Sequence, residues 1–266
     1  MEWSRRALLV LVSFSVACSL GGLSGFSSGG APSGDPDGGT PDATEPLDAS
    51  DDVDVDASDG ALTPQFFDDF ERDTVVGPWV SRAVGGNGTI SIDTTTFHSA
   101  TRSLRAHAPV GTGAAAYLHT VFPEPTSRVI VTFWMKAPAS TRNAQIARLR
   151  LETPDSVGGQ LMLEARNGTV VLAEQAYERS DFSNYARYDL AGFKPDVWQQ
   201  WTLEVDASAS PTRARVTIDG ALAVERLLSN PFPRGALHVH VGIAFVNVAR
   251  PELTVHYDDV AVTYDP

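Results

Sequence analysis

The residues best suited to chemistry lie between residues 177 and 193, where aromatic side chains are mixed with charged and amide groups. The aromatic residues include Tyr177, Tyr185 and Tyr188, and the polar ones include Arg179, Asp181, Asn184 and Arg187. Flat aromatic rings stack on sugar rings, and the polar groups hydrogen-bond sugar hydroxyls. We interpret the stretch as a long loop that contacts a carbohydrate. The alternative is a crossover segment whose aromatic rings pack against the edge of the domain.

A second group of candidates is a row of alternating charges. Arg148, Arg150 and Glu152 are spaced two apart, so on a β-strand their side chains share one face. Such a face either contacts a ligand or is solvated. Both arginines are therefore candidate ligand-binding residues.

Two histidines and two tryptophans complete the candidates. His238 and His240 also share one face of a predicted strand, and two such imidazoles chelate zinc when His256 or a carboxylate comes near. The alternative is that they form the polar face of the strand. Trp198 and Trp201 are three apart and therefore face opposite sides of a strand. We assign Trp201 to the core and treat Trp198 as an exposed platform for a ligand.

Several classes of function have no support in the sequence. No glycine-rich phosphate loop follows a predicted strand, and no serine stands in a nucleophile-elbow pattern. The net charge is −13, to which residues 19–64 contribute −10, residues 1–18 contribute +1, and residues 65–266 contribute −4. Nucleic-acid binding requires clustered basic residues, and the sequence has no such cluster. We therefore predict no nucleotide, acyl-transfer or nucleic-acid chemistry.

The elements that must position the candidates are short strands. After Pro64 the sequence alternates between apolar and polar residues, with Gly, Pro, Asn and Asp between the runs. Asn167-Gly168 and Asp219-Gly220 predict tight hairpin turns, and Asn87-Gly88 predicts a third. Further strands are predicted at 103–107, 115–122, 128–136, 144–152, 201–206, 237–245 and 253–263. Because no long stretch has helical periodicity, we predict an all-β domain, a two-sheet antiparallel jelly-roll sandwich.

Short motifs in this domain resemble a known superfamily. Trp201-Thr-Leu-Glu-Val-Asp206, followed by Arg215-Val-Thr-Ile-Asp219-Gly220-Ala-Leu-Ala-Val224, is similar to the central hairpin of concanavalin A-like, laminin-G-like jelly rolls. Phe67-Asp-Asp-Phe-Glu-Arg72, His98-Ser-Ala-Thr-Arg-Ser-Leu-Arg105 and Tyr257-Asp-Asp-Val-Ala-Val262 resemble the opening, second and closing strands of that superfamily and of β-sandwich carbohydrate-binding modules. The similarity spans most of residues 65–266. The motifs are structural, so they indicate the fold more than a function.

The resemblance implies two enzymatic sites to look for. Hydrolytic members carry Glu-x-Asp-x-x-Glu on one strand, and this chain has no such triplet. Lyase members use Arg, Gln, His and Tyr to neutralise a uronate and move a proton. The charged row from Arg148 to Glu152 suits such a site, but Gln145-Ile146-Ala147 stands where the motif would be Gln-Ile-His. The sequence therefore favours a solvated or ligand-contacting strand face over a lyase site.

The resemblance also implies a structural calcium ion. In the sandwich modules a Ca²⁺ often bridges the opening and closing strands, and the matching positions are Asp69, Glu71 and Asp259. Hard oxygen ligands suit Ca²⁺, and joining the two ends would stabilise a domain without disulfides. The alternative is that these acids are strand-end residues facing water.

The N-terminus predicts an export signal with a lipid anchor. Arg5 and Arg6 precede the apolar run 7–16, and small residues follow. Cys18, the only cysteine, resembles the lipidated cysteine of bacterial lipoproteins, although Ser15 stands where that family usually has Leu. The alternative is an ordinary signal that is cleaved near an incidental cysteine.

A tether follows the signal. Residues 19–64 contain ten acidic residues and no Lys or Arg, and they have almost no aromatic residues. Such a segment cannot bury enough apolar surface to fold, and its charges repel one another. We therefore predict a disordered acidic linker.

Together these features predict a signal peptide at 1–18, a tether at 19–64 and a sandwich domain at 65–266. We hypothesise a protein secreted across the inner membrane and lipid-anchored in the cell envelope, at the outer membrane or cell surface. Its jelly roll would bind a polysaccharide or envelope glycan without catalysis. One alternative is a polysaccharide lyase or glycoside hydrolase, which needs a cleft lined by Arg148, Arg150, Glu152 and nearby Tyr or His with shifted pKa values. The other is a structural or adhesion domain, which needs no groove.

Overall fold

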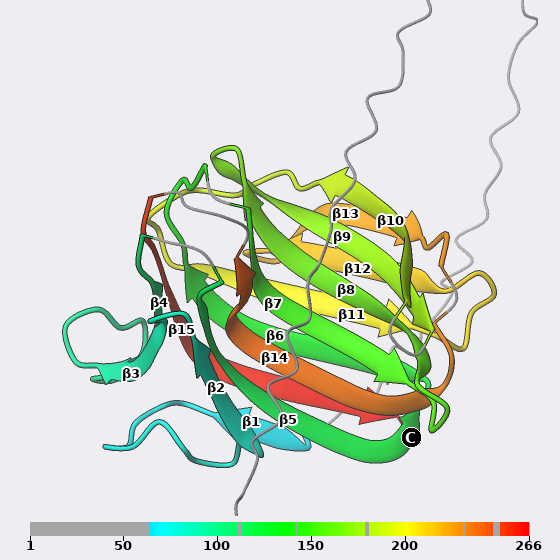
Figure 1. The fold of residues 1–266 in the computed structure, drawn as a ribbon, viewed down its shortest axis with the longest axis horizontal. Helices are drawn as coiled ribbons and strands as arrows, with labels where there is room; N and C mark the ends of the chain where they lie inside the picture. The colour runs from blue at the N-terminus through cyan, green and yellow to red at the C-terminus, as the bar shows by residue number, and fades with distance from the viewer. Residues whose placement is uncertain are drawn as a thin grey trace, which may run out of the picture. The chain divides into compact units, whose positions relative to one another are not determined.

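The domain is built from β-strands in two antiparallel sheets (Figure 1). The computed structural model describes residues 64–110, 113–141, 143–178, 181–230, 232–246 and 251–265, so the predicted signal, Cys18 and nearly all of the tether lie outside the described residues. Within these ranges no helix is long and apolar enough to span a bilayer. The strands are β1 (Phe66–Asp68), β2 (Ser81–Gly85), β3 (Thr89–Asp93), β4 (Ser103–Ala108), β5 (Ala115–Thr126), β6 (Arg128–Lys136), β7 (Ala144–Glu152), β8 (Val157–Arg166), β9 (Thr169–Glu178), β10 (Asp181–Asp189), β11 (Gln199–Asp206), β12 (Arg213–Ile218), β13 (Ala221–Leu227), β14 (Gly235–Val246) and β15 (Leu253–Asp265).

The strand order brings together segments that are distant in sequence. One sheet has the order β13-β12-β11-β6-β15-β4-β3, with β1 also paired to β15, and the other has the order β10-β9-β8-β7-β14-β5-β2. In the second sheet β14 lies between β7 and β5, so residues near 240 meet residues near 148 and 119. The predicted all-β, two-sheet jelly-roll sandwich is confirmed.

The core lies between the two sheets. Along β6 the residues alternate strictly between half-buried and buried, because successive side chains of a strand point to opposite faces. The largest fully buried side chains include Trp201, Tyr257 and Phe133, and burying a side chain such as phenylalanine contributes about 1.5–3 kcal/mol. The core position predicted for Trp201 is confirmed.

Two of the three predicted hairpins are confirmed. Asn167 and Gly168 join β8 to β9 with φ of 50° and 84°, and Asp219 and Gly220 join β12 to β13 with φ of 53° and 77°. These positive angles suit Asn, Asp and Gly and favour tight turns between antiparallel strands.

Two local predictions are wrong. Asn87-Gly88 does not close a hairpin, because β2 pairs with β5 in one sheet whereas β3 pairs with β4 in the other. The turn instead carries the chain between the sheets.

The long loop predicted over residues 177–193 is mostly β10, which pairs with β9 at the edge of the second sheet. Its charged and amide residues are tolerated in a strand because only one neighbour covers an edge strand.

Candidate functional site

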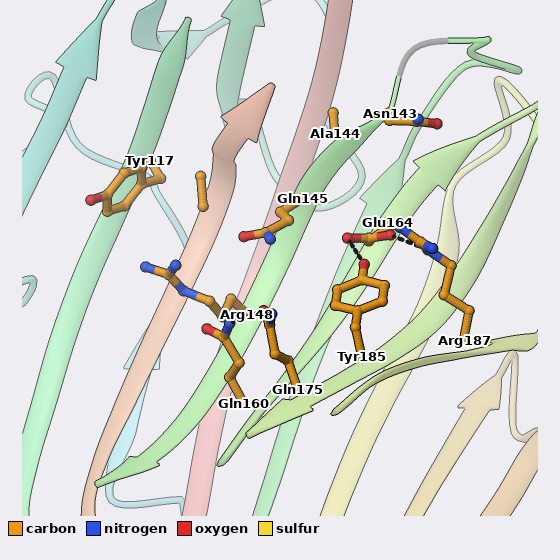
Figure 2. A pocket seen from close by; sticks show the side chains of 11 residues that line it. Tyr117, Asn143, Ala144, Gln145, Arg148, Gln160, Glu164, Gln175, Tyr185 and Arg187 are labelled. Atoms are coloured by element: carbon orange, nitrogen blue, oxygen red, sulfur yellow. Dashed lines mark hydrogen bonds and ion pairs between the residues drawn. The ribbon is translucent and has the colours of Figure 1, made fainter. Parts of the chain in front are cut away.

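The outer face of the seven-stranded sheet carries a hollow of about 490 Å³, which we call the groove (Figure 2). Its lining residues come from β5, β14, β7, β8, β9 and β10, so it runs across the strands. Asn143, which lies just before β7, is one of the polar lining residues. The others are Tyr117, Gln145, Arg148, Gln160, Glu164, Gln175, Tyr185 and Arg187.

Arg148 is held by a row of side chains on three adjacent strands. It lies opposite His240 in the register of β7 and β14, with its Nη2 3.0 Å from His240 Nδ1. His240 lies opposite His119 of β5, and the two imidazole rings stack with centroids 4.3 Å apart. The ring of Tyr117 lies 5.1 Å from that of His240. The sheet therefore aligns a guanidinium, two imidazoles and a phenol.

Two residues further along the same strands, a second row of side chains, which we call the next rung, repeats this chemistry. Arg150 lies opposite His238, whose Nδ1 is 3.2 Å from His119 Nε2. Glu152 forms an ion pair with Arg150 and has its Oε2 3.6 Å from His238 Nε2. Arg148, Arg150 and Glu152 therefore project from the same face, as their spacing predicts.

Burial keeps the histidines of these rows neutral at neutral pH. Desolvation, followed by the charges of His238 and the two arginines, lowers the pKa of His119 to about 4. Desolvation and the Arg148 guanidinium hold the pKa of His240 far below its ordinary value. Burial also lowers the pKa of Arg148, although an arginine stays protonated in proteins. The charge at the centre of the groove is therefore positive.

The β10 end of the groove holds a buried carboxylate. Glu164 is 7 % exposed; its Oε1 accepts a hydrogen bond from the Tyr185 hydroxyl, and its Oε2 lies 3.0 Å from Arg187 Nε. The Arg187 guanidinium lies 4.1 Å from the centroid of the Tyr185 ring, a cation–π contact. These contacts fix the ring of Tyr185 in the wall of the groove.

Several polar atoms of the groove have no hydrogen-bond partner among the described residues. They are Asn143 Oδ1, Gln145 Oε1 and Arg148 Nε, and all three are buried. A buried polar atom without a partner costs about 1–3 kcal/mol. Hydroxyl donors and an anionic acceptor are the groups that would complement these atoms.

Comparisons with known proteins show which fold the domain has. Neither a protein-family model nor a curated protein matches the chain. An endo-β-1,4-glucuronan lyase from the fungus Trichoderma reesei matches with a TM-score of 0.56 and 17% identity, over 76% of this chain and 96% of the lyase. The cellulose-induced protein Cip1 matches with a TM-score of 0.51 and 14% identity, over 75% of this chain and 97% of Cip1. The domain has the concanavalin A-like jelly-roll fold. At these identities the likeness shows the fold alone.

The concanavalin A-like sheet brings only some of the predicted ligand-binding residues together. Arg148 and Tyr185 line the groove, and Arg150 lies one rung away. Tyr177 belongs to the same face but is only 4 % exposed, with the Arg150 guanidinium 5.1 Å from the centroid of its ring. Its hydroxyl reaches across Gly158, where a Cβ would approach that oxygen to 2.4 Å. Tyr177 therefore forms part of the floor beside the groove and offers no open ring face.

Two other predicted residues lie apart from the groove, and a third lies outside the described residues. Tyr188 points away from Tyr185, and its hydroxyl donates to Glu174 Oε1 at 2.6 Å. Trp198 lies beside β11 on the other sheet, with its ring 6.0 Å from that of His98 and 6.4 Å from that of His256. Arg179 lies outside the described residues. Tyr188 and Trp198 therefore do not share a surface with Arg148 and Tyr185.

Of the two third ligands offered for zinc, His256 is excluded by its position, whereas a carboxylate, that of Glu152, does lie 3.6 Å from His238. His256 belongs to β15 in the other sheet, where its Nε2 lies 3.0 Å from Asp93 Oδ2. The actual neighbour of His238 and His240 is His119, whose ring is stacked with theirs. Among the described residues, no group of three or more His, Cys, Asp and Glu side chains is arranged to hold a metal ion.

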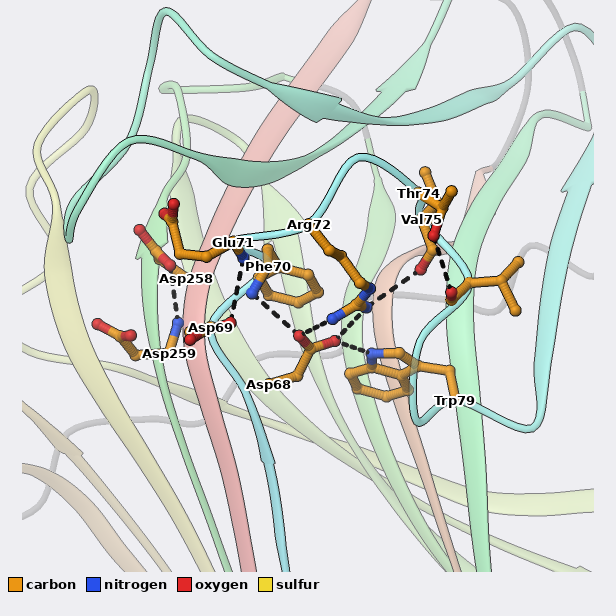
Figure 3. A network of polar contacts seen from close by, with 11 residues as sticks. Asp68, Asp69, Phe70, Glu71, Arg72, Thr74, Val75, Trp79, Asp258 and Asp259 are labelled. Atoms are coloured by element: carbon orange, nitrogen blue, oxygen red, sulfur yellow. Dashed lines mark hydrogen bonds and ion pairs between the residues drawn. The ribbon is translucent and has the colours of Figure 1, made fainter.

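Figure 3 shows how the acids predicted to bind calcium lie near one another, and two of them, Glu71 and Asp259, contact the loop of residues 98–102. The Glu71 carboxylate accepts hydrogen bonds from the backbone nitrogens of Thr101 and Arg102 at 3.0 and 2.8 Å. Asp259 Oδ1 accepts one from Ser99 Oγ at 3.0 Å, and Asp69 Oδ1 accepts one from the Glu71 nitrogen at 3.1 Å. The two ends of the concanavalin A-like domain are thus tied to the same loop by carboxylates.

Sequence reasoning missed several residues that lie in or beside the groove around Arg148. Tyr117 and His119 alternate within a predicted strand, and Gln160 and Glu164 alternate within a predicted hairpin. That alternation was the available signal, since polar residues at every second position mark the outer face of a strand. Which strands are neighbours depends on the topology, and the sequence pattern does not give it.

Proposed function

We propose that the domain binds an anionic polysaccharide that contains uronic acid, and that the groove is its binding site. The observation that carries the proposal is Arg148, a cation in the centre of a groove whose amide oxygens at Asn143 and Gln145 have no partner among the described residues. A guanidinium recognises a carboxylate through paired N–H donors, and the amides recognise hydroxyls. Uronic acid residues carry both groups.

The surroundings of Arg148 favour an anion over a cation or a neutral ligand. Its close neighbours His240 and His119 are uncharged at neutral pH, because burial lowers their pKa values. The nearest carboxylates on this face, Glu152 and Glu164, are already paired with Arg150 and Arg187. The positive charge of Arg148 is therefore available to a ligand.

The N-terminal sequence supports the proposal that this binding takes place at the envelope. The export signal and the lipobox-like Cys18 suit a lipid anchor, and the acidic tether would give the domain reach from the membrane. In this proposal the protein holds an acidic glycan at the outer membrane or cell surface.

Calorimetric titration with uronic acid oligosaccharides tests the binding proposal. The chain from residue 19 onward should bind, and Arg148→Gln should weaken binding about tenfold or more, because a hydrogen bond to a charged group contributes about 1.5–3 kcal/mol. Arg215→Gln is the matched control: Arg215 is an exposed arginine on β12 in the other sheet. Equal affinity of the Arg148 variant and the wild type would refute the proposal.

Cleavage of the same glycan by β-elimination is the second candidate, and Tyr117 favours it. Its ring stands next to His240 in the row that ends at Arg148. The glucuronan lyase that shares this fold is named for a polyuronate, which makes this reaction class a reasonable analogy. In the structure the Tyr and His that a lyase cleft needs come from β5 and β14, although the Gln-Ile-His motif is absent.

In the elimination Tyr117 would act first as the base and then as the acid, which requires its hydroxyl to be deprotonated when the substrate binds. Arg148 pairs with the uronate carboxylate and makes the proton on C5 more acidic. The Tyr117 phenolate takes that proton, the C5–H electron pair forms the C4–C5 double bond, and the bond from C4 to the glycosidic oxygen breaks. The phenol then gives its proton to the departing oxygen, which restores the phenolate.

Ultraviolet absorbance of the unsaturated product separates the two candidates. If the domain is a lyase, absorbance rises with the wild type, and Tyr117→Phe lowers the rate by about 10²–10⁴-fold, the usual contribution of a general acid–base group. Binding without any rise in absorbance would leave the non-catalytic role.

A further inference from the structure

A second hollow adjoins the groove on the same face of the sheet. It has a volume of about 450 Å³ and is lined by Arg150 and Glu152 of β7, His238 of β14, and Arg234 just before β14, with walls formed by prolines that include Pro125 and Pro154. Prolines give these walls rigid apolar surfaces beside the charged groups. The hollow therefore combines polar groups with flat apolar walls.

The register of β7 and β14 fixes the position of this hollow relative to the groove. Arg148 and His240 form one rung, and Arg150 and His238 form the rung two residues further along. Two residues of a strand span about 7 Å. Arg148 lines the groove and Arg150 lines the second hollow, so the two hollows lie over neighbouring residue pairs of β7 and β14.

Arg234 is the charge in the second hollow that is open to a ligand. Arg150 is paired with Glu152, and burial keeps the pKa of His238 below its ordinary value. Arg234 is exposed and has no hydrogen-bond or ion-pair partner among the described residues. One guanidinium beside apolar walls suits an anionic sugar.

We propose that this second hollow binds a further anionic group, a carboxylate or a sulfate ester, carried by the same glycan whose uronate occupies the groove. The inference rests on the proposed function and narrows its ligand to polymers with anionic groups on successive or nearby sugars. Oligosaccharides long enough to reach both hollows then gain affinity from Arg234. Short ones contact Arg148 alone.

Affinity as a function of ligand length tests the inference. Titrations use uronic acid oligomers from two to eight sugars, and a sulfated neutral oligosaccharide distinguishes carboxylate from sulfate. Arg234→Gln removes the charge from an exposed position, so the fold should be unaffected. Arg215→Gln on the other sheet is the matched control. We expect Arg234→Gln to weaken binding of the longest oligomers about tenfold and to leave the shortest unchanged.

The outcomes separate this inference from the proposed function. If the wild type gains affinity with length and Arg234→Gln abolishes that gain, the inference holds. If the wild type binds but Arg234→Gln matches it at every length and with the sulfated ligand, the second site is refuted and the groove proposal stands. If the wild type binds no anionic oligosaccharide, both are refuted.

Discussion

Tyr185 and Tyr188 stand three residues apart on β10, and they point to opposite sides of the sheet. The Tyr185 hydroxyl bonds Glu164 in the wall of the groove, whereas the Tyr188 hydroxyl bonds Glu174, which has no exposed surface. An odd spacing on a strand places two side chains on opposite faces. Two tyrosines that look equivalent in the sequence therefore have different roles.

Substitution of each tyrosine by phenylalanine should separate binding from stability. Tyr185→Phe should raise the Kd for an acidic oligosaccharide several-fold, because Glu164 loses the hydroxyl group that orients it. Tyr188→Phe should leave Kd unchanged and lower the free energy of unfolding by about 1.5–3 kcal/mol, since the buried Glu174 carboxylate loses a hydrogen bond. Titration calorimetry and urea unfolding measure the two effects. The same pattern in both variants would contradict the assignment.

Stability should fall as the pH decreases from about 6.5 toward 4. The pKa of His119 in the folded domain is about 4, against an ordinary value of 6.5. In this window the unfolded chain binds a proton that the folded domain does not, so the free energy of unfolding falls with decreasing pH by up to about 1.4 kcal/mol per pH unit for each such histidine. His240 and His238, whose pKa values are also lowered, act in the same direction.

The variant His119→Gln isolates this contribution. Urea unfolding at several pH values should give a smaller dependence of stability on pH than in the wild type. His98→Gln is the control, because His98 lies near Trp134 on the other sheet, away from this row. An unchanged pH dependence in His119→Gln would show that this histidine titrates normally in the folded domain.

Calcium should raise the melting temperature of the domain if Asp69, Glu71 and Asp259 bind it. Burial raises the pKa of the adjacent Asp258, so a cation at this place would relieve an unfavourable negative charge. At a hundredfold excess over Kd the ion adds about 2.7 kcal/mol, a rise of roughly 5–10 °C in Tm for a domain of this size. Melting in Ca²⁺ and in chelator measures the effect, and Asp69→Asn should abolish it. Identical curves in Ca²⁺ and chelator would refute the prediction.

Cys18 should decide where the protein is found in the cell. Lipidation of this cysteine attaches the exported chain to a membrane, and Cys18→Ser removes the only thiol that can carry the lipid. Expressed in a bacterium, the wild type should incorporate labelled palmitate and fractionate with membranes. The variant should do neither. Equal fractionation of both proteins would indicate an ordinary signal peptide.

Strands could be predicted from the sequence where one face of the strand is buried. The predicted strands at 128–136 and 144–152 have the observed bounds of β6 and β7, because their inward positions are apolar at every second residue. The edge strand β10 was missed for the opposite reason. A strand with a single neighbour keeps more polar residues, and its pattern is that of a loop.

The groove was predictable only in part. Arg148 and Arg150 were visible as a charged row, but their partners Tyr117, His119 and His240 lie far from them in sequence. They meet because β14 inserts between β5 and β7. That order is set by how two whole sheets close over one core, which no local spacing reveals.

Asp68 should be the side chain whose loss most weakens the N-terminal edge of the sandwich (Figure 3). Its carboxylate is 2 % exposed, pairs with Arg72 and accepts a hydrogen bond from Trp79 Nε1 at 2.5 Å. Asp68→Asn keeps the size but leaves the Arg72 guanidinium without its counter-charge. Breaking a buried ion pair costs about 3–5 kcal/mol, and partial exposure of Arg72 places the expected loss near the lower value.

Urea unfolding of Asp68→Asn measures that loss, and Asp73→Asn provides the control. Asp73 also pairs with an arginine, Arg102, but its side chain is 89% exposed, so its removal should cost at most about 1 kcal/mol. The two variants make the same chemical change five residues apart and differ in burial. If they cost the same, burial of Asp68 does not determine its contribution, and the network around Trp79 is held by packing of the indole ring rather than by the carboxylate.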